Sequence, residues 1–339
     1  MKKLFLLDAF ALIYRAHFAF IRNPLINSKG MNVSAITGFT NTLWDVLQKE
    51  NPSHIAVVFD LPGPTFRHDM YEPYKAQREA QPEDITISIP YIKKIIKAFN
   101  IPVAFCEGYE ADDVIGTLAK QAEKEGFDVF MMTPDKDYAQ LVSEKIFMYK
   151  PARFGNAVEV LGEKEILEKW QIKRIDQVID ILGLQGDAVD NIPGIKGIGA
   201  KTAVKLLAQY DNIEGLLEHA HELKGKQREK VEAGREDALM SKKLATIALD
   251  CPIQFNAENY KVEPFNRPDL QDIFNELEFR RLSKRILGLS TANAKVQLDL
   301  FGNVVESSEP KSTAQQPGSI VPNHIDNVEH SYHLVNSKE

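Results

Sequence analysis

Cysteine is scarce in this sequence, and the apolar run near its start is short. The 339 residues include only Cys106 and Cys251, which are set far apart and can build neither a disulfide framework nor a cysteine zinc site. Asp8 interrupts the first apolar run after four residues, too soon for a signal peptide or a membrane span. These features predict a protein of the reducing cytoplasm with no membrane partner.

An excess of positive charge is also missing. The formal net charge of −7 counts against a nucleic-acid partner, because phosphates bind basic surfaces. Hydrophobic residues at 44% and charged residues at 26% are ordinary for a globular protein, and the length predicts two domains with a short extra piece. The positions of the acidic residues therefore decide what the negative charge means.

Short apolar runs alternate with helical patterns in the first half of the chain. Runs typical of buried parallel strands are residues 3–7, 54–59, 102–105 and 128–133, with edge strands expected at 146–149 and 157–161. Apolar residues at helical spacing occur at 33–48, 88–99 and 111–124. This alternation predicts an α/β domain, with helices on both faces of a mainly parallel sheet, over residues 1–172.

The pattern changes after residue 170, where strand-like runs nearly vanish. Amphipathic segments follow at 175–182, 200–209, 213–218, 227–233, 237–244 and 272–287. They predict an all-helical domain over residues 173–289. Residues 290–331 are rich in Ser, Pro and Gln and predict a flexible linker, and residues 332–339 look like the first strand of a further domain.

Acidic residues follow the predicted inner strands. The seven carboxylates are Asp8, Asp60, Glu110, Asp112, Asp113, Asp135 and Asp137. Because the carboxyl ends of parallel strands lie along one edge of a sheet, these side chains are expected to converge there. Gathered carboxylates repel one another at pH 7 unless cations neutralise them.

Carboxylate oxygens without His or Cys select hard ions, so the pattern predicts two Mg²⁺ or Mn²⁺ ions. Such a pair is the usual device for hydrolysing phosphodiester bonds. Two further acids, Asp187 and Asp190, face the same way if their segment is helical, and a capped loop is the alternative. The histidines His17, His54 and His68 have no catalytic motif around them and are interpreted as surface or packing residues.

A glycine-rich segment, IPGIKGIGAKTAVKLL at 192–207, predicts a helix–hairpin–helix. Its glycines permit a tight turn and close approach to another molecule, and the next helix offers free N–H groups to a phosphate. This motif grips DNA backbone without reading sequence. The positions expected to contact DNA are Gly194, Lys196, Gly197, Gly199 and Lys201.

Residues 61–84 show little apolar periodicity. Their basic and aromatic side chains include Arg67, His68, Tyr71, Tyr74, Lys75 and Arg78. Interleaved charges and rings suit a single nucleic-acid strand, through phosphate pairing and base stacking, and a solvated loop is the alternative.

These residues together resemble a known family. LLDAFALIYRAHFAF, VVFDLPGPTFRHDMYEPYKAQR, GYEADD, TPDKD and GDAVDNIPGIKGIGAKTA are similar to the 5′-nuclease (5′→3′ exonuclease and flap endonuclease) domain at the N-terminus of bacterial DNA polymerase I. The resemblance covers residues 1 to about 290. It implies a PIN-like α/β catalytic domain with a helical arch near 66–95, followed by the helical domain that holds the hairpin.

The resemblance also implies roles for single residues. The family's metal ligands fall on Asp8, Asp60, Glu110, Asp112, Asp113, Asp135, Asp137, Asp187 and Asp190. By analogy Asp60, Glu110 and Asp112 belong to one ion, and the ligands from Asp135 onward to the other. Lys75, Arg78 and Arg15 match catalytic phosphate contacts, and Arg67 and Tyr74 match DNA contacts in the arch. The hairpin of this family also holds K⁺ on backbone carbonyls.

The implied activity is a structure-specific 5′→3′ exonuclease and 5′-flap endonuclease that uses two metal ions. Its expected substrates are DNA with a 5′ flap, a nick or a 5′ end, including RNA-primed strands, in primer removal, nick translation and repair. We expect a monomer near the nucleoid, and no polymerase activity, since SYHLVNSKE resembles only the start of the following domain. The alternatives are a non-catalytic DNA-junction binding module, which loses metal ligands, and a PIN-type ribonuclease, which lacks the hairpin.

QLDLF at 297–301 resembles the pentapeptide that binds the bacterial sliding clamp. The anchoring side chains are Gln297, Leu298, Leu300 and Phe301. A short apolar anchor beside a flexible segment needs a partner to bury it, and a final turn packed on the domain is the alternative.

The negative charge then divides in an informative way. Residues 291–339 carry three Lys or Arg and six Asp or Glu, which leaves −4 for residues 1–290. Without the nine predicted ligands, the rest of that part carries +5. The remaining charge is compatible with binding a phosphate backbone.

Overall fold

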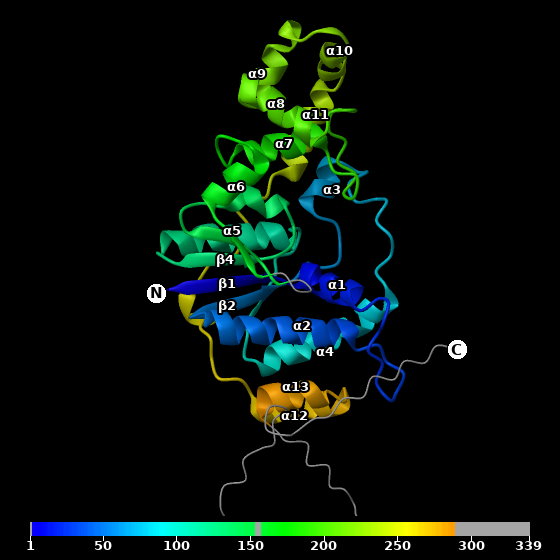
Figure 1. Ribbon diagram of the computed structural model, residues 1–339, viewed down its shortest axis with the longest axis vertical. Helices are drawn as coiled ribbons and strands as arrows, with labels where there is room; N and C mark the ends of the chain where they lie inside the picture. Colours follow the sequence, from blue (N-terminus) through cyan, green and yellow to red (C-terminus); the bar gives the residue numbers. More distant parts are fainter. Residues whose placement is uncertain (1, 153–156, 289–339) are drawn as a thin grey trace, which may run out of the picture. The chain divides into compact units, whose positions relative to one another are not determined.

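A six-stranded sheet forms the centre of the computed structural model, which describes residues 2–152 and 157–288 (Figure 1). Its strand order is β3-β2-β1-β4-β5-β6, and all neighbours are parallel except β5 and β6. The strands are β1 (Lys3–Asp8), β2 (His54–Val58), β3 (Val103–Ala104), β4 (Asp128–Met132), β5 (Ile146–Lys150) and β6 (Glu159–Leu161). Each of the six predicted strands is present, with ends that differ by at most two residues, and the predicted α/β fold class is confirmed.

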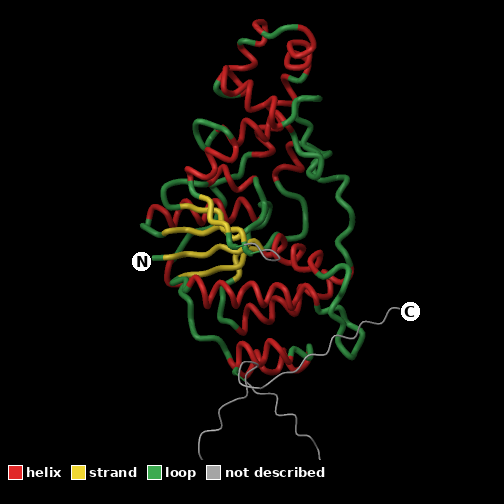
Figure 2. The backbone as a smooth tube through the Cα atoms, in the orientation of Figure 1, coloured by secondary structure: helices red, strands yellow, loops and turns green. Residues whose placement is uncertain are grey.

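Alternate residues of β1 enter two different cores, because successive side chains of a strand point to opposite faces. Leu4 and Leu6 pack in the core beneath one covering helix, α5 (Ala111–Lys124). Phe5 and Leu7 pack in the core on the other face. That face is covered by α1 (Ala9–Ala19), α2 (Ser34–Asp45) and α4 (Glu83–Ala98). Figure 2 shows the strands grouped between these helices.

The helices that follow the sheet form a third core on the α5 side. They are α6 (Glu163–Trp170), α7 (Gln177–Gln185), α8 (Ala200–Tyr210), α9 (Ile213–Glu218), α10 (Gly225–Ala233) and α11 (Arg235–Ala245). Helix α7 joins this core to the sheet, since Leu182 packs with the α5 side and Ile181 packs with α8 and α9. The predicted change from strands to helices after residue 170 is therefore present.

The last two helices lie on the opposite face of the sheet. These are α12 (Arg267–Glu276) and α13 (Arg280–Leu287), whose apolar residues pack with those of α2 and α4 (Figure 1). The end of the predicted 173–289 helical domain thus belongs to the core of the α/β part. The prediction of one helix over 272–287 is wrong, because Glu278 has φ 63° and Leu277 and Phe279 turn into the core.

Shorter elements complete the described chain. They are the one-turn helix α3 (Phe66–Met70), the π-helical turn η1 (Val46–Glu50) and the 3₁₀ turns η2 (Asp137–Leu141), η3 (Ala220–Glu222) and η4 (Ala257–Tyr260). The sequence pattern missed α1, α3 and α6. Within the described ranges, no helix has the length and apolar character needed to cross a membrane.

Candidate metal and nucleic-acid site

The carboxyl ends of the central strands place acidic side chains at one edge of the sheet, and helix N-termini hold two of them in position. Asp8 ends β1, and its Oδ1 accepts a hydrogen bond from the Ala11 N–H at 3.0 Å. Asp60 follows β2, and its Oδ1 accepts from the Ala111 N–H at 2.8 Å. Asp8 Oδ2 also accepts from Thr133 Oγ1 at 3.0 Å. Each carboxylate is therefore fixed by the start of a neighbouring helix or by the next strand end.

Burial and mutual repulsion raise the pKa values of three acids near the ends of β1 and β2 and the start of α5, namely Asp8, Asp60 and Asp112. Burial raises the pKa of Asp8 to about 7, and the charges of Asp60 and Asp135 add to this rise. The pKa of Asp60 is raised by burial and by the charge of Glu110. Burial raises the pKa of Asp112 well above its usual range, with Glu110 again contributing. These acids lie within each other's electric fields, as the strand-end pattern predicts.

A second group of acids surrounds the turn after β4. Burial raises the pKa of Asp137 to about 7, and the charges of Asp135, Asp187 and Asp190 raise it further against the lowering effect of Lys136. Asp135 Oδ1 accepts from the Asp137 N–H at 3.0 Å. Within the described part of the chain, Asp137 Oδ1 is the buried side-chain oxygen that has no hydrogen-bond partner.

Three cations lie among these acids. Lys75 Nζ is 2.7 Å from Glu110 Oε1 and 3.8 Å from Asp190 Oδ2. Arg78 Nη2 is 2.5 Å from Asp190 Oδ1, and Lys136 Nζ is 3.3 Å from Asp187 Oδ2. In this arrangement, no three Asp, Glu, His or Cys side chains of residues 2–152 and 157–288 are grouped so that they could hold one metal ion. Their present partners are basic side chains that a substrate phosphate also attracts.

Asp113 has a different partner from the other predicted ligands. Its two oxygens accept from both terminal nitrogens of Arg67 at 2.7 Å, and the pair is buried, with exposed fractions of 0% and 2%. The N–H groups of Glu110 and Ala248 also donate to this carboxylate. Arg67 Nε further donates to Leu244 O at 2.9 Å. Asp113, predicted as a metal ligand, and Arg67, predicted as a DNA contact, satisfy each other inside the core in this structure, which gives the pair a structural role.

Tyr74 is also in the interior. It is 3% exposed, and its hydroxyl donates to Glu110 Oε2 at 3.1 Å. In this arrangement the ring of Tyr74 is not accessible to a DNA base, so its predicted contact with DNA stays a prediction. The predicted arch near 66–95 is helical only at its two ends, α3 and α4, and residues 71–82 between them run along one side of the fold as turns at 72–77 and an irregular stretch after them (Figure 1). We call residues 71–82 the arch segment.

Asp187 and Asp190 lie on a turn, so of the two alternatives left open by the sequence the loop is the one present. Asp187 and Ile192 pair through both backbone hydrogen bonds, at 2.9 and 2.8 Å, which closes the turn. We call residues 187–191 the linking turn, because hydrogen bonds join it to the arch segment. Asp190 O accepts from the Lys75 N–H at 2.9 Å, and Asn191 Nδ2 donates to Pro73 O at 2.7 Å. Gln77 donates to Ala188 O.

Sequence reasoning missed the role of Asn191. It is a non-glycine residue with φ 58° directly before an Ile-Pro-Gly segment, and Asn is the residue type that tolerates this conformation best after Gly. That combination is the signal that could have marked it.

The predicted helix–hairpin–helix is present between α7 and α8. Gly194 has φ 58°, and a Cβ there would lie 2.4 Å from the backbone N of Gly186. Gly194 is buried and its N–H donates to Ser241 Oγ at 2.9 Å, so in this structure it packs the turn against α11. Lys196, Gly197 and Gly199 are exposed, and Lys201 is exposed in the first turn of α8. The exposed side of the hairpin can therefore meet another molecule.

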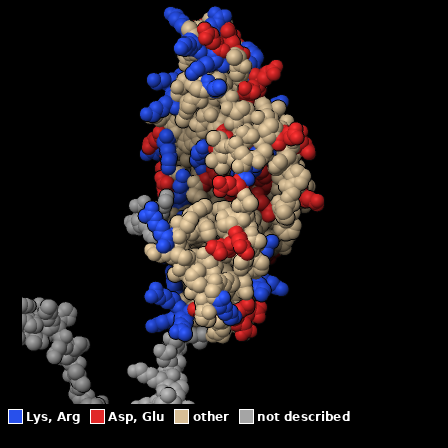
Figure 3. Space-filling model, turned by 90° about the vertical axis from the view of Figure 1, so that its right-hand side faces the viewer, with Lys and Arg blue, Asp and Glu red and all other residues tan. Residues whose placement is uncertain are grey.

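Arg15 of α1 reaches the end of β5, where its guanidinium donates to the carbonyls of Pro151 and Ala152. The clamp-like residues Gln297, Leu298, Leu300 and Phe301, the linker and residues 332–339 lie outside the described residues. Figure 3 shows Asp and Glu gathered in the middle of one face, with Lys and Arg along one margin and at both ends. This distribution places basic side chains around the acidic group.

Two family models match the chain. The model for the 5'-3' exonuclease N-terminal resolvase-like domain matches residues 3–171, and that for the 5'-3' exonuclease C-terminal SAM fold matches residues 174–268. The chain is 42% identical over 296 residues to DNA polymerase I of Bacillus subtilis, covering 87% of this chain and 33% of that protein. It is 38% identical over 289 residues to a 5'-3' exonuclease of Aquifex aeolicus, covering 84% and 96%. The chain therefore spans about a third of the length of such polymerase relatives.

Solved structures share the fold. The T5 5'-exonuclease with bound zinc matches with a TM-score of 0.59 at 20% identity, over 72% of this chain and 89% of that chain. A bacteriophage T5 flap endonuclease solved as a pseudo-enzyme-product complex with DNA and metal ions matches with a TM-score of 0.60 at 20% identity, over 81% and 99%. These likenesses establish the same arrangement of elements.

Proposed function

Since the chain belongs to the 5'-3' exonuclease family, which is also the nuclease region of DNA polymerase I, we propose that it hydrolyses DNA at 5′ ends, nicks and 5′ flaps, including RNA-primed strands. The observation that carries this proposal is the gathering of eight acids at one edge of the sheet with Lys75 and Arg78 among them. A site with this composition suits a phosphodiester and has no nucleophilic Ser or Cys in its motifs.

The chemistry of these acids suits two divalent ions of the Mg²⁺ or Mn²⁺ type, although binding requires the side chains to draw closer than they stand in this arrangement. All the ligand atoms are carboxylate oxygens, Asp137 Oδ1 is buried without a partner, and burial opposes ionisation of Asp8 and Asp112 without added cations. Asp60, Glu110 and Asp112 would hold one ion. The other would be held by Asp135, Asp137, Asp187 and Asp190.

Asp8 lies between these two sets of ligands, since the charge of Asp60 from the first set and that of Asp135 from the second both raise its pKa. Divalent zinc ions are bound to the T5 5'-exonuclease, whose fold is the same, and this supports the assignment. When bound, such ions lower the pKa of an attacking water and neutralise charge on the phosphate.

The cations of the arch segment bind and orient the scissile phosphate. Lys75 and Arg78 sit at the acidic edge, and each exchanges its carboxylate partner for a phosphate oxygen when a strand enters. Arg15 at the end of β5 is a third phosphate contact. Asp113 and Arg67 do not touch the strand, and they hold α3 against α5.

The hairpin binds the duplex next to the cleaved strand. Lys196, Gly197, Gly199 and Lys201 present charge and open backbone to a phosphate, and K⁺ would bind the hairpin carbonyls. Contacts of this kind fix the position of the duplex without reading its sequence. The complex of the T5 flap endonuclease with DNA supports this partner.

We place this activity in primer removal, nick translation and repair, in the cytoplasm near the nucleoid, with the protein acting as a monomer. The motif at 297–301 would attach it to a sliding clamp. Binding of the clamp is expected to be lost in Leu300→Ala/Phe301→Ala, and unchanged affinity in a titration would discard this partner.

The decisive experiment measures cleavage of labelled 5′-flap, nicked and single-stranded DNA with Mg²⁺. Asp8→Ala, Asp60→Ala and Asp135→Ala are expected to lose cleavage and keep duplex binding, whereas the control Asp128→Asn, at the opposite end of β4, keeps both. Wild-type turnover in a chelator contradicts the metal mechanism. Flap binding without cleavage would favour a junction-binding module, and cleavage of RNA without junction preference would favour a PIN-type ribonuclease.

A further inference from the structure

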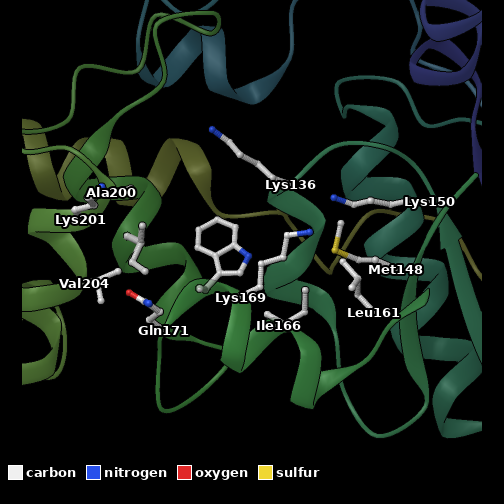
Figure 4. A pocket seen from close by; sticks show the side chains of 12 residues that line it. Lys136, Met148, Lys150, Leu161, Ile166, Lys169, Gln171, Ala200, Lys201 and Val204 are labelled. Atoms are coloured by element: carbon white, nitrogen blue, oxygen red, sulfur yellow. The ribbon is translucent and has the colours of Figure 1, made fainter. Parts of the chain in front are cut away.

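A cavity of about 290 Å³ lies beside the acidic site, between β5, α6 and the first turn of α8 (Figure 4). It is close to the lower limit of small-molecule sites, about 300 Å³. Lys136, which is one of its lining residues, lies between Asp135 and Asp137 in the chain. The cavity therefore adjoins the proposed cleavage site, because Lys136 lines the cavity and its Nζ is 3.3 Å from Asp187 Oδ2.

Lysines surround the mouth of this cavity. Lys136, Lys150, Lys169 and Lys201 line it, and Figure 4 shows the ammonium groups of Lys150 and Lys169 pointing toward one another. Burial and the charge of Lys169 lower the pKa of Lys150. These cations repel one another, so an anionic ligand would stabilise the arrangement.

Carboxylates balance only part of this charge. Glu159 is 3.3 Å from Lys169, and Asp187 is 3.3 Å from Lys136. Among the residues that the structure describes, no carboxylate lies within 4.0 Å of the ammonium group of Lys150 or Lys201, although the charges of Glu159 and Asp135 act on Lys150 from farther away. Two of the four lysines are therefore left to pair with an anion from outside.

The interior of the cavity is apolar and includes an indole. Met148, Leu161 and Ile166 line one side and Val204 of α8 lines the other (Figure 4). Trp170 also lines the cavity, and it is half-buried because it packs against both the sheet core and the helical core. A planar aromatic group fits this lining, since it stacks on the indole and excludes water from the apolar side chains.

We propose that this cavity binds one nucleoside monophosphate unit, with its base against Trp170 and its phosphate on Lys150 and the neighbouring lysines. The proposal rests on the proposed nuclease function, because substrate and products of that reaction carry this chemistry. The unit has two possible sources: a free 5′-mononucleotide released by cleavage, or a nucleotide that remains in the strand.

The test is a titration with deoxyadenosine 5′-monophosphate in a chelator, so that the acidic site does not contribute. The chain has two tryptophans, and Trp44→Phe leaves Trp170 as the reporter of fluorescence. We expect saturable quenching that weakens about tenfold in Lys150→Gln, since a charge-assisted hydrogen bond is lost. Val204→Phe, which fills the cavity, is expected to abolish quenching without removing charge.

The matched control is Lys164→Gln, on α6 but outside the lining, and it is expected to bind like the parent. Deoxyadenosine without phosphate is expected to bind several-fold more weakly. The proposal is overturned if quenching does not saturate at millimolar nucleotide, or if Lys164→Gln and Lys150→Gln weaken binding equally. The cavity would then be only a gap in the packing between two cores.

Two arms separate the sources of the nucleotide. If the unit is a released product, the mononucleotide inhibits flap cleavage, and Lys150→Gln relieves this inhibition. If it belongs to the strand, Lys150→Gln weakens binding of a 5′-phosphorylated single strand in the chelator. Nucleotide binding without any cleavage contradicts only the proposed function, and cleavage without nucleotide binding contradicts only this inference.

Discussion

Arg67 of α3 and Arg78 of the arch segment, which lie close together in the sequence, make one buried and one exposed ion pair. Arg67 and Asp113 are 2% and 0% exposed and form a bidentate ion pair between α3 and α5. Arg78 and Asp190 are 49% and 22% exposed and pair at the edge of the acidic site. The same chemistry holds the fold together in one case and remains available to a substrate in the other. Burial, rather than residue type, decides which role an ion pair has.

Breaking the buried pair is expected to have the largest effect. Arg67→Leu leaves the Asp113 carboxylate without its partner in the core, which destabilises a protein by about 3–5 kcal/mol. Urea denaturation followed by circular dichroism measures this loss. The double variant Arg67→Leu/Asp113→Leu removes both charges and is expected to recover part of the stability. If Arg67→Leu keeps wild-type stability and loses only DNA binding, the comparison of the two pairs fails.

Breaking the exposed pair is expected to affect catalysis instead. Arg78→Ala should change stability by less than about 1 kcal/mol, because exposed pairs contribute little. Cleavage of a 5′ flap should fall by about 10²–10³-fold, as when a preorganised donor to a transition-state oxygen is removed.

The matched control for this variant is Lys124→Ala, at the end of α5, which should keep both properties. Single-turnover rates at saturating enzyme separate slower chemistry from weaker binding. A loss of more than about 2 kcal/mol of stability in Arg78→Ala would mean that both pairs are structural.

The linking turn gives an intermediate case, because it carries proposed ligands and also holds the arch segment. Asn191→Ala removes the hydrogen bond to Pro73 O, which costs about 1 kcal/mol, and places Ala at φ 58°, which costs roughly 1 kcal/mol more. We expect about a tenfold loss of flap cleavage, since Lys75 and Arg78 are positioned by the same contacts, with little change in affinity for a blunt duplex. Asn191→Gly keeps the positive φ without the side chain and separates the backbone effect from the hydrogen bond. Equal cleavage in both variants and the wild type excludes this coupling.

The sheet and its acidic edge could be predicted because both depend on local patterns. Buried parallel strands read as apolar runs, and the residues that follow them must share an edge, as Asp8 and Asp60 do. Burial within a charged segment could not be predicted in this way. Arg67 and Asp113 have the residue types of site residues, and only the packing of α3 against α5 and α11 shows that they satisfy each other.

Other misses have equally local causes. Helix α1 was missed because Asp8 is both the last residue of β1 and the N-cap of α1. No turn separates the two elements, so the apolar residues of the helix follow those of the strand without a break in the sequence. Asp187 and Asp190 have helical spacing, but the pairing of Asp187 with Ile192 closes a turn that spacing alone does not reveal. The break between α12 and α13 depends on Glu278 adopting a left-handed conformation, for which its residue type gives no signal.

The smallest expected effect is a pH dependence of the free energy of unfolding, which comes from the acidic site and not from the buried Arg67–Asp113 pair. Burial raises the pKa of Asp8 from 3.8 to about 7 in the folded chain, so below pH 7 the folded state binds a proton that the unfolded state releases. In a chelator, stability should therefore rise as pH falls from 8 to 6, by about 1 kcal/mol for this group. Asp8→Asn should reduce this slope by the contribution of Asp8 and leave that of Asp137, whose pKa burial also raises to about 7, whereas the control Asp128→Asn should retain the full slope. Added Mg²⁺ should stabilise the wild type most at pH 8, where ligands are ionised, and a wild-type chain whose stability in chelator falls between pH 8 and 6 contradicts this account of Asp8.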